Sequence, residues 1–243
     1  IKDYEYSNDS SITNIIIPTS VKSIGTNSFY KCSSLISVKI PASVTFIGDY
    51  AFSECVSLKN IEIPPSLQFI CNFTFSGCKS LNEISIPSSV RSIGNCAFKK
   101  CSNLKVIEIN PYKTDFKKDS FSECDSLNYL IFNSSVKTIK KYNFNRFEHL
   151  SQIVIPDSVT LIENYAFQNT SALEKISISP SVSIVPRDAF DGCLELKELT
   201  INPYKTSFDS NDLSNYSSLI RLIFDSSVLS IKQANLHLFN HFK

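Results

Sequence analysis

Apolar residues recur at a fixed interval along almost the whole chain. The register that repeats every 23 positions contains Ile12, Leu35, Leu58, Leu81, Leu104, Leu127, Leu150, Leu173, Leu196, Leu219 and Phe242. A fixed period of about 20 to 29 residues is typical of a solenoid, in which each repeat adds one turn to a continuous stack. The pattern therefore predicts a coil of repeated units, each 23 residues long.

One repeat, residues 35–57, indicates which element each segment forms. Val38 and Ile40 alternate with polar residues, which predicts a short strand with one buried face. Pro41 ends this strand, because proline has no N–H to donate to a neighbouring strand. The next segment, 43–48, is predicted to be a turn with two apolar side chains pointing inward.

The end of the repeat has a different spacing. Phe52, Cys55 and Leu58 are three residues apart, which predicts a short helical or 3-10 turn with its apolar side inward. The phenylalanine position recurs as Phe29, Phe52, Phe75, Phe98, Phe121, Phe144, Phe167 and Phe190. A single repeat cannot bury its apolar side alone, so the stacked repeats are expected to share one core.

These elements predict an α/β solenoid of leucine-rich repeats, a class with this period. About ten repeats are expected to form a right-handed superhelix, with a parallel β-sheet on the concave face and short helical or 3-10 turns on the convex face. We expect one domain over residues 1–243, with a partial repeat at 1–11 and a truncated repeat at 236–243. Solenoids of this kind present extended surfaces, which favours binding over catalysis.

The composition argues against several function classes. The formal net charge of +1 gives no overall attraction to nucleic acid or to an anionic membrane. No run of 18 apolar residues occurs, so we expect no membrane insertion in this segment. Residues 1–5 are polar and lack both an initiator methionine and the features of a signal peptide. We therefore expect the chain to be a piece of a longer protein.

Candidate catalytic and metal-binding residues are few. His237 and His241 lie four residues apart near the chain end, with no acidic residue between them. His149 directly precedes a predicted strand and is expected at the surface. No serine-hydrolase, zinc-protease or phosphate-loop motif occurs. We therefore expect a protein that is not an enzyme and that has no cofactor and no metal site.

The cysteines follow the repeat. Six of the eight share one repeat position, namely Cys32, Cys55, Cys78, Cys101, Cys124 and Cys193. Their parallel side chains favour core filling over disulfides, and Phe147 and Tyr216 replace cysteine at this position in other repeats. Cys71 and Cys96 lie outside this series, and a disulfide between them stays an alternative. The short C-x-x-C spacing that a zinc site needs does not occur.

A recurring motif identifies a family. Residues 40–58 contain Ile-Pro-Ala-Ser-Val, then Ile-Gly, then Ala-Phe-x-x-Cys-x-x-Leu, and residues 86–104 repeat this motif with one serine in place of alanine. It resembles the BspA-type (Treponema-like) leucine-rich repeat over essentially the whole chain. The glycine changes to Lys140, Glu163 and Pro186 in later repeats. The resemblance implies a surface-associated protein of a bacterium or a parasitic protist, in a family with members linked to adhesion, and it implies no catalytic residues.

The outward positions of the predicted strands form the candidate binding surface. An acidic stretch of three glutamates lies beside an apolar group, at positions where polar residues are usual, and such a group indicates an interface. The alternative is that these residues reflect strand propensity alone. The residues expected to contact protein are Val106, Glu108, Tyr129, Ile131, Gln152, Val154, Glu62 and Glu83.

Two functions follow. The first is a non-catalytic protein–protein interaction module, an adhesin-like protein that is at the cell surface or secreted and binds a protein of a host or neighbouring cell. The second is a cytoplasmic leucine-rich repeat scaffold that docks regulatory or structural proteins. Glycans at the five N-x-[ST] sequons favour the first, and eight free thiols favour the second. A homodimer through a solenoid end is a further expectation.

Overall fold

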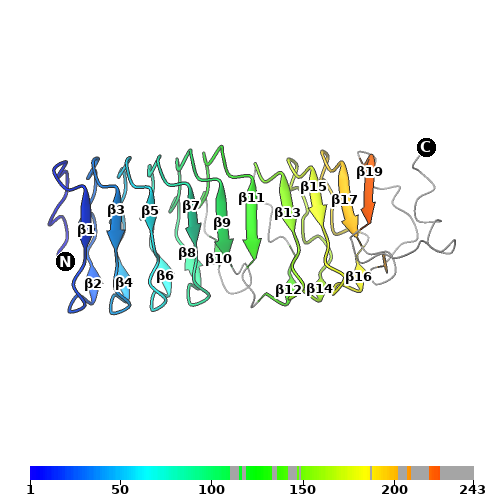
Figure 1. Ribbon diagram of the computed structural model, residues 1–243, viewed down its shortest axis with the longest axis horizontal. Helices are drawn as coiled ribbons and strands as arrows, with labels where there is room; N and C mark the ends of the chain where they lie inside the picture. The colour runs from blue at the N-terminus through cyan, green and yellow to red at the C-terminus, as the bar shows by residue number, and fades with distance from the viewer. Residues whose placement is uncertain are drawn as a thin grey trace. The chain divides into compact units, whose positions relative to one another are not determined.

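The computed structural model places two compact units in the chain, residues 1–128 and residues 129–243. It describes residues 1–109, 115–116, 119–132, 136–141, 147, 149–186, 188–201, 207–208 and 219–224. Figure 1 shows both units as parallel β-solenoids, in which successive coils carry strands in the same direction. This confirms the predicted leucine-rich repeat coil.

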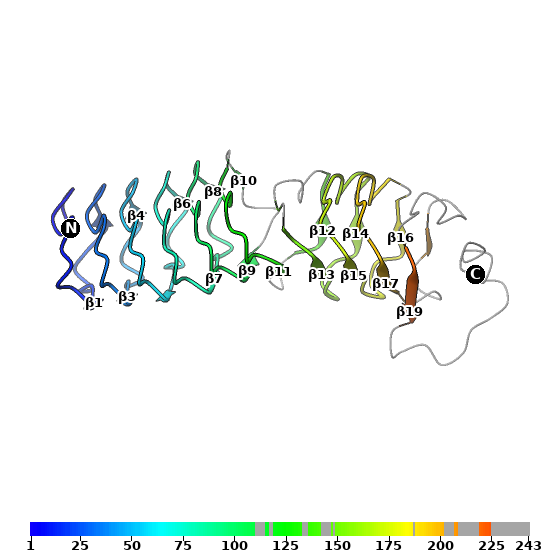
Figure 2. The same cartoon turned by 90° about the horizontal axis from the view of Figure 1, so that it is seen from above.

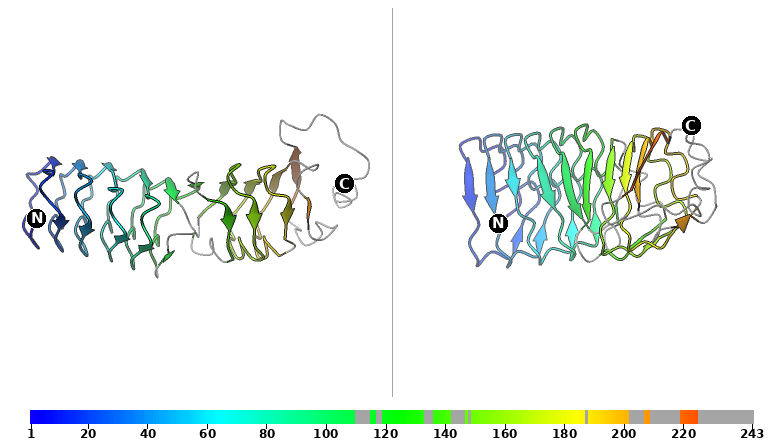
Figure 3. Two further views of the ribbon diagram at one scale, coloured as in Figure 1. Left: turned by 90° about the horizontal axis from the view of Figure 1, so that it is seen from below. Right: turned by 45° about the vertical axis from the view of Figure 1, so that its right-hand side comes forward.

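A row of parallel strands forms one side of unit 1 (Figure 3). It consists of β1 (Asn14–Ile16), β3 (Ser37–Lys39), β5 (Asn60–Ile61), β7 (Glu83–Ser85) and β9 (Val106–Ile109). Paired residues on neighbouring strands are 23 positions apart, as in Asn14 with Ser37 and Glu83 with Val106. Buried residues alternate with outward-facing ones, so the strands predicted from the sequence are confirmed.

Each described repeat of unit 1 also contributes a second strand, which is two residues long. In unit 1 these are β2 (Ser23–Ile24), β4 (Phe46–Ile47), β6 (Phe69–Ile70), β8 (Ser92–Ile93) and β10 (Asp115–Phe116). Seen from above, this second row lies on the opposite side of the coil from the first row (Figure 2). The sequence predicted only a turn here. The isoleucine of each pair from β2 to β8 is buried, as expected for the inward side chains of that turn.

Unit 2 has the same two rows. The first consists of β11 (Tyr129–Phe132), β13 (Gln152–Val154), β15 (Lys175–Ser177), β17 (Glu198–Ile201) and β19 (Arg221–Phe224). The second consists of β12 (Thr138–Ile139), β14 (Leu161–Ile162), β16 (Ile184–Val185) and β18 (Ser207–Phe208). The residues after Phe224 lie outside the described part of the chain, so the count of about ten repeats stays a prediction.

Stacked phenylalanine rings run through the core of each unit. In unit 1 the rings of Phe29 and Phe52 are nearly parallel, and their centroids are 5.2 Å apart. Phe75 and Phe98 continue the stack. In unit 2, Phe167 and Phe190 stack at 5.1 Å. Successive coils are one strand spacing apart, and this distance places each ring within the range of offset stacking with the next ring. The phenylalanine position predicted to be buried is therefore confirmed for these residues.

The helical or 3-10 turns expected at residues such as 52–58 are not found in the described residues. Instead, Tyr50 and Glu54 adopt left-handed backbone angles, with φ of 57° and 60°. Alternate N–H groups then donate to the next repeat, as from Phe52 to the Thr74 carbonyl at 2.9 Å. A helix would direct these N–H groups to its own carbonyls. The stacked coil gives them partners on its neighbour, so a different turn forms.

The cysteine series fills the core and also makes hydrogen bonds. The Cys55 Sγ lies 3.1 Å from the Phe29 carbonyl oxygen, and the Cys78 Sγ lies 3.2 Å from the Phe52 carbonyl oxygen. The thiol donates and the carbonyl accepts, which satisfies a buried backbone group. All eight cysteines are free, so the alternative disulfide between Cys71 and Cys96 is not formed. The core-filling position agrees with the prediction, whereas the hydrogen bond was not predicted.

Candidate functional site

The outward residues of the first strand row in unit 1 carry negative charge. Glu62 and Glu83 are exposed, and Glu108 is half-buried. The Ser85 hydroxyl donates a hydrogen bond of 2.9 Å to the Glu108 carboxylate on the next strand. Within the described residues, neither Glu62 nor Glu83 has an ion-pair partner. The acidic stretch predicted from the sequence is therefore an outward-facing row on neighbouring strands.

A shallow groove lies beside these carboxylates. It has a volume of about 300 Å³ and lies between β3 and β5, where Ser37, Lys39, Asn60 and Glu62 supply polar side chains. The Ser37 hydroxyl donates to the Asn14 side-chain oxygen at 2.6 Å. The groove combines one cation and one carboxylate. Such a surface suits a polar rim of an interface more than a dry, apolar pocket.

The first strand row of unit 2 carries the predicted apolar residues. Ile131 is 42% exposed and Val154 is 46% exposed, on neighbouring strands β11 and β13. Tyr129 is half-buried and lies directly opposite Gln152 in the strand register. These four residues form one continuous surface, which we call the unit 2 apolar patch.

The eight predicted residues thus lie on two surfaces. Val106 is half-buried on β9 and belongs to unit 1 together with the three glutamates. The other four belong to unit 2. All eight point outward, as the strand alternation predicted.

Sequence reasoning missed an ion-pair row next to the unit 2 apolar patch. The Glu198 carboxylate lies 3.3 Å from the Lys175 Nζ and 2.7 Å from the Arg221 guanidinium. The Glu198 side chain is only 18% exposed, whereas the Arg221 side chain is 65% exposed. The signal was present in the sequence, because these three residues are 23 positions apart and occupy one column. Opposite charges alternating at that spacing predict cross-strand pairs.

The second strand row exposes apolar residues that the sequence did not single out. Phe46 on β4 is 49% exposed and Phe69 on β6 is 53% exposed. In unit 2, Leu161 on β14 and Ile184 on β16 take the same repeat position and are 50% and 53% exposed. The position looked like part of a turn, so nothing marked it as an outward strand residue.

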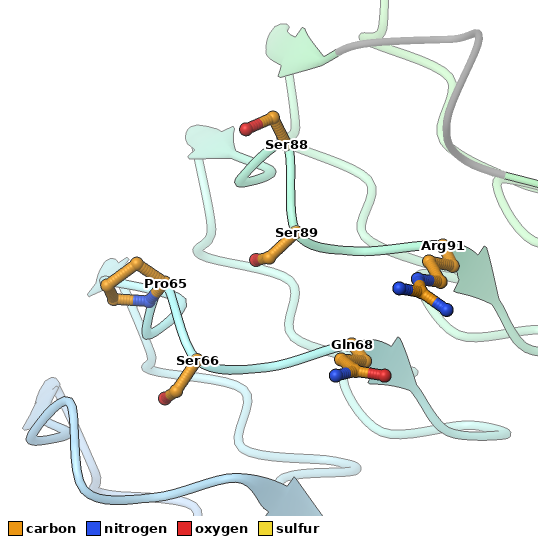
Figure 4. Close-up of a pocket in the computed structure, with 6 residues that line it drawn as sticks. All are labelled: Pro65, Ser66, Gln68, Ser88, Ser89 and Arg91. Atoms are coloured by element: carbon orange, nitrogen blue, oxygen red, sulfur yellow. The ribbon is translucent and has the colours of Figure 1, made fainter.

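A larger groove lies between two successive turns of unit 1. It has a volume of about 630 Å³ and is lined by Pro65, Ser66, Gln68, Ser88, Ser89 and Arg91. Figure 4 shows three of these residues on each turn, with Gln68 and Arg91 at the same end of their turns. Five of the six lining side chains are polar. This groove is distinct from both strand-row surfaces.

Burial keeps several cysteine thiols protonated, so these thiols are not activated nucleophiles. Burial raises the pKa of Cys193 to about 12 and that of Cys71 to about 11. Burial also raises the pKa of Cys78 well above the usual thiol range. A thiol must be deprotonated to attack a substrate or to bind a metal, so these groups are inert near neutral pH.

Metal ligands do not gather in the part of the chain that the structure describes, where no group of three His, Cys, Asp or Glu side chains is placed to hold an ion. His149 is exposed, as predicted. His237 and His241 lie outside the described residues. Within the described ranges, no helix has the length and apolar character needed to cross a bilayer.

Solved structures similar to this chain include bacterial leucine-rich repeat proteins. A leucine rich cell surface protein from Faecalibacterium prausnitzii is 22% identical, with a TM-score of 0.43, over 98% of this chain and 84% of that one. The leucine rich repeat protein of T. pallidum is 25% identical, with a TM-score of 0.39, over 86% of this chain and 76% of that one. Comparison with curated proteins finds no match.

The family is identified by the repeat itself. The family model of the BspA type leucine rich repeat region, which describes six copies of the repeat, matches residues 1–128 and again residues 114–240. These two matches span nearly the whole chain and include the coils described above. The chain therefore belongs to the BspA-type leucine-rich repeat family.

Proposed function

We propose that this chain is a non-catalytic protein-interaction module that binds a protein ligand through the outward face of its first strand row, the face predicted from the sequence to be concave. The observation that carries the proposal is the unit 2 apolar patch. Ile131 and Val154 leave apolar surface in water on adjacent strands, with Tyr129 and Gln152 beside them. Contiguous apolar groups on a polar face favour a partner, and tyrosine is frequent at binding hot spots.

The surrounding charges support the same surface. The Lys175, Glu198 and Arg221 side chains form ion pairs on the next three strands of the row and so give the patch a polar border. An apolar centre with a polar, solvent-accessible rim is the usual anatomy of a protein interface. In unit 1, Glu62, Glu83 and Glu108 supply a second, acidic surface for the same class of ligand.

The test is a capture experiment with surface proteins from candidate host cells. The double variant Ile131→Ser with Val154→Ser removes the apolar surface without touching the core. The control is Ile184→Ser, because Ile184 is somewhat more exposed than Ile131 and Val154 but lies on the second strand row. We expect the double variant to bind any captured protein at least about tenfold more weakly than the wild-type chain does. The control is expected to bind it as the wild-type chain does. Equal binding of the captured protein by the wild-type chain, the double variant and the control would contradict the proposal.

We also propose that the chain acts at the cell surface, as the family resemblance implies. The competing proposal is an intracellular scaffold, and the eight free thiols support it because reducing compartments preserve them. An antibody against this chain distinguishes the two on intact and permeabilised source cells. Signal on intact cells supports the surface proposal, and signal only after permeabilisation supports the scaffold.

A further inference from the structure

We propose that the groove between residues 65–68 and 88–91 of unit 1 binds a carboxylate-bearing saccharide. This site is separate from the protein-binding surface proposed above and does not depend on it. The groove, of about 630 Å³, falls within the range of small-molecule sites, about 300 to 1,000 Å³.

The lining side chains match a ligand rich in hydroxyl groups. Gln68 offers an amide with both a donor and an acceptor, and Ser66, Ser88 and Ser89 offer hydroxyls. Figure 4 shows these groups on two successive turns that run side by side. Side chains that donate and accept at short intervals suit the alternating hydroxyls of a sugar ring.

One of these hydroxyls departs from the pattern of the repeat. The Ser43 and Ser66 hydroxyls donate to the Val21 and Val44 carbonyls at 2.8 Å and 2.6 Å. Ser89 and, in unit 2, Ser158 occupy the same repeat position, yet their hydroxyl oxygens are buried and have no hydrogen-bond partner. A buried hydroxyl without a partner is costly, and a ligand toward which the Ser89 hydroxyl rotates would remove that cost.

The positive charge of Arg91 at one end of the groove favours an anionic ligand. Arg91 is exposed and forms no ion pair with any described residue. A guanidinium binds a carboxylate through two parallel N–H donors, which is stronger and more directional than a contact with lysine. In unit 2, Asp157 and Thr160 stand at the repeat positions of Ser88 and Arg91, so the same turn there does not favour an anion.

The backbone of the groove argues against a peptide as its ligand. The Arg91 N–H already donates to the Gln68 carbonyl at 2.7 Å, and the Val90 N–H donates to the Pro87 carbonyl at 3.0 Å. An extended peptide gains much of its affinity from free main-chain groups of its receptor. These main-chain groups are occupied, so recognition falls to the side chains.

The experiment is a calorimetric titration with trigalacturonate as the probe. A neutral galactose trisaccharide and triglutamate serve as comparison ligands of similar length. We expect trigalacturonate to bind and the neutral sugar and the peptide to bind at least about tenfold more weakly. Equal binding of the neutral sugar overturns the role of the charge, and equal binding of triglutamate overturns the saccharide class.

The variant Arg91→Gln locates the site. It is expected to weaken trigalacturonate binding about tenfold or more, because it removes a charged donor pair. Lys22→Gln is the matched control, since Lys22 is an exposed cation at the same repeat position but outside the groove. Both residues are exposed, so both variants are expected to fold, and circular dichroism checks this. No binding by the wild-type chain, or equal loss in both variants, overturns the proposal.

Discussion

Two phenylalanines six residues apart show how strongly position within the repeat determines what a residue does. Phe52 is fully buried and stacks between Phe29 and Phe75, whereas Phe46 is 49% exposed on the second strand row. Truncating a buried aromatic side chain removes its transfer free energy and leaves a cavity. Truncating a half-exposed one leaves no cavity.

We expect Phe52→Ala to lower the free energy of unfolding by about 3 to 5 kcal/mol. Phe46→Ala is expected to lower it by about 0.5 kcal/mol or less. Urea unfolding followed by circular dichroism measures both changes. Similar losses in the two variants would show that the assignment of inward and outward positions is wrong.

The buried thiols make a second residue-scale prediction, which concerns pH. Burial raises the pKa of Cys193 to about 12, from 9.0 for an ordinary thiol. The folded state therefore holds its proton more tightly than the unfolded chain. This contribution to stability is complete below pH 9 and is lost as the pH rises from about 9 to about 12.

We expect the free energy of unfolding to fall in this window, with Cys193 contributing about 1 kcal/mol per pH unit. Tyrosines and lysines also titrate in this window, but they are the same in the wild-type chain and in the variant Cys193→Ala. The free energy of unfolding of the variant should therefore fall less steeply with pH, and the difference isolates the contribution of Cys193. The measurement is urea unfolding at pH 7, 9 and 10.5. Parallel curves for the two proteins would contradict the burial argument.

At the scale of the element, the turns depend on close contact between successive coils. A Cβ atom added at Gly48 would lie 2.7 Å from the Thr26 backbone nitrogen, which is too close for any side chain. Gly77 has a different constraint, a left-handed φ of 75°, and an added Cβ there would meet only the flexible side chain of Glu54. Backbone cannot move aside as readily as a side-chain end.

We therefore expect Gly48→Ala to be more destabilising than Gly77→Ala. The first forces two coils apart and is expected to cost about 3 kcal/mol, within the upper range for overpacking. The second adds a left-handed penalty of about 1 kcal/mol. Thermal unfolding ranks the two variants, and the reverse order would show that backbone angle matters more than the spacing between coils.

The same elements show what the sequence could predict. The first strand row was predictable because Val38 and Ile40 alternate with polar residues over several positions. The second row was not, because a two-residue strand such as Phe46–Ile47 is too short to show alternation. The left-handed turns were missed because Tyr50 and Glu54 are not glycines, and their angles arise from hydrogen bonds to another repeat.

The candidate sites divide in the same way. The outward position of Ile131 followed from strand alternation, and the structure places it there. The groove at Arg91 did not follow, because its lining residues come from two turns and only the folded stack brings them together. Ser89 looks like Ser66 in the sequence, and its lack of a hydrogen-bond partner is visible only in three dimensions.

At the scale of the whole molecule, the coil is a stack of nearest-neighbour contacts. In unit 1, hydrogen bonds of the turns join each repeat to the next, as from Phe52 to Thr74. Stability in such a stack is approximately the sum of repeat and interface contributions. Damage to one repeat is therefore expected to stay local.

We expect Phe52→Ala to reduce amide hydrogen-exchange protection mainly in residues 24–84, the repeats on either side of the change. Protection of β13 and β15 in unit 2 is expected to stay the same, because these strands contact no residue of the altered repeat. Hydrogen-exchange mass spectrometry on wild-type and variant chains measures both regions. A uniform loss across the two units would show that the chain unfolds as a single cooperative body.

The fixed register between coils also constrains how such a gene can change its length. Every described strand pair, in both rows, joins residues that are 23 positions apart. Inserting one codon into a strand or a tight turn shifts one row against the other and reverses the inward and outward side chains. Inserting or deleting 23 codons restores both rows at once. Recombination between repeats can therefore lengthen or shorten this protein in whole coils, and the binding surface can grow without a new fold.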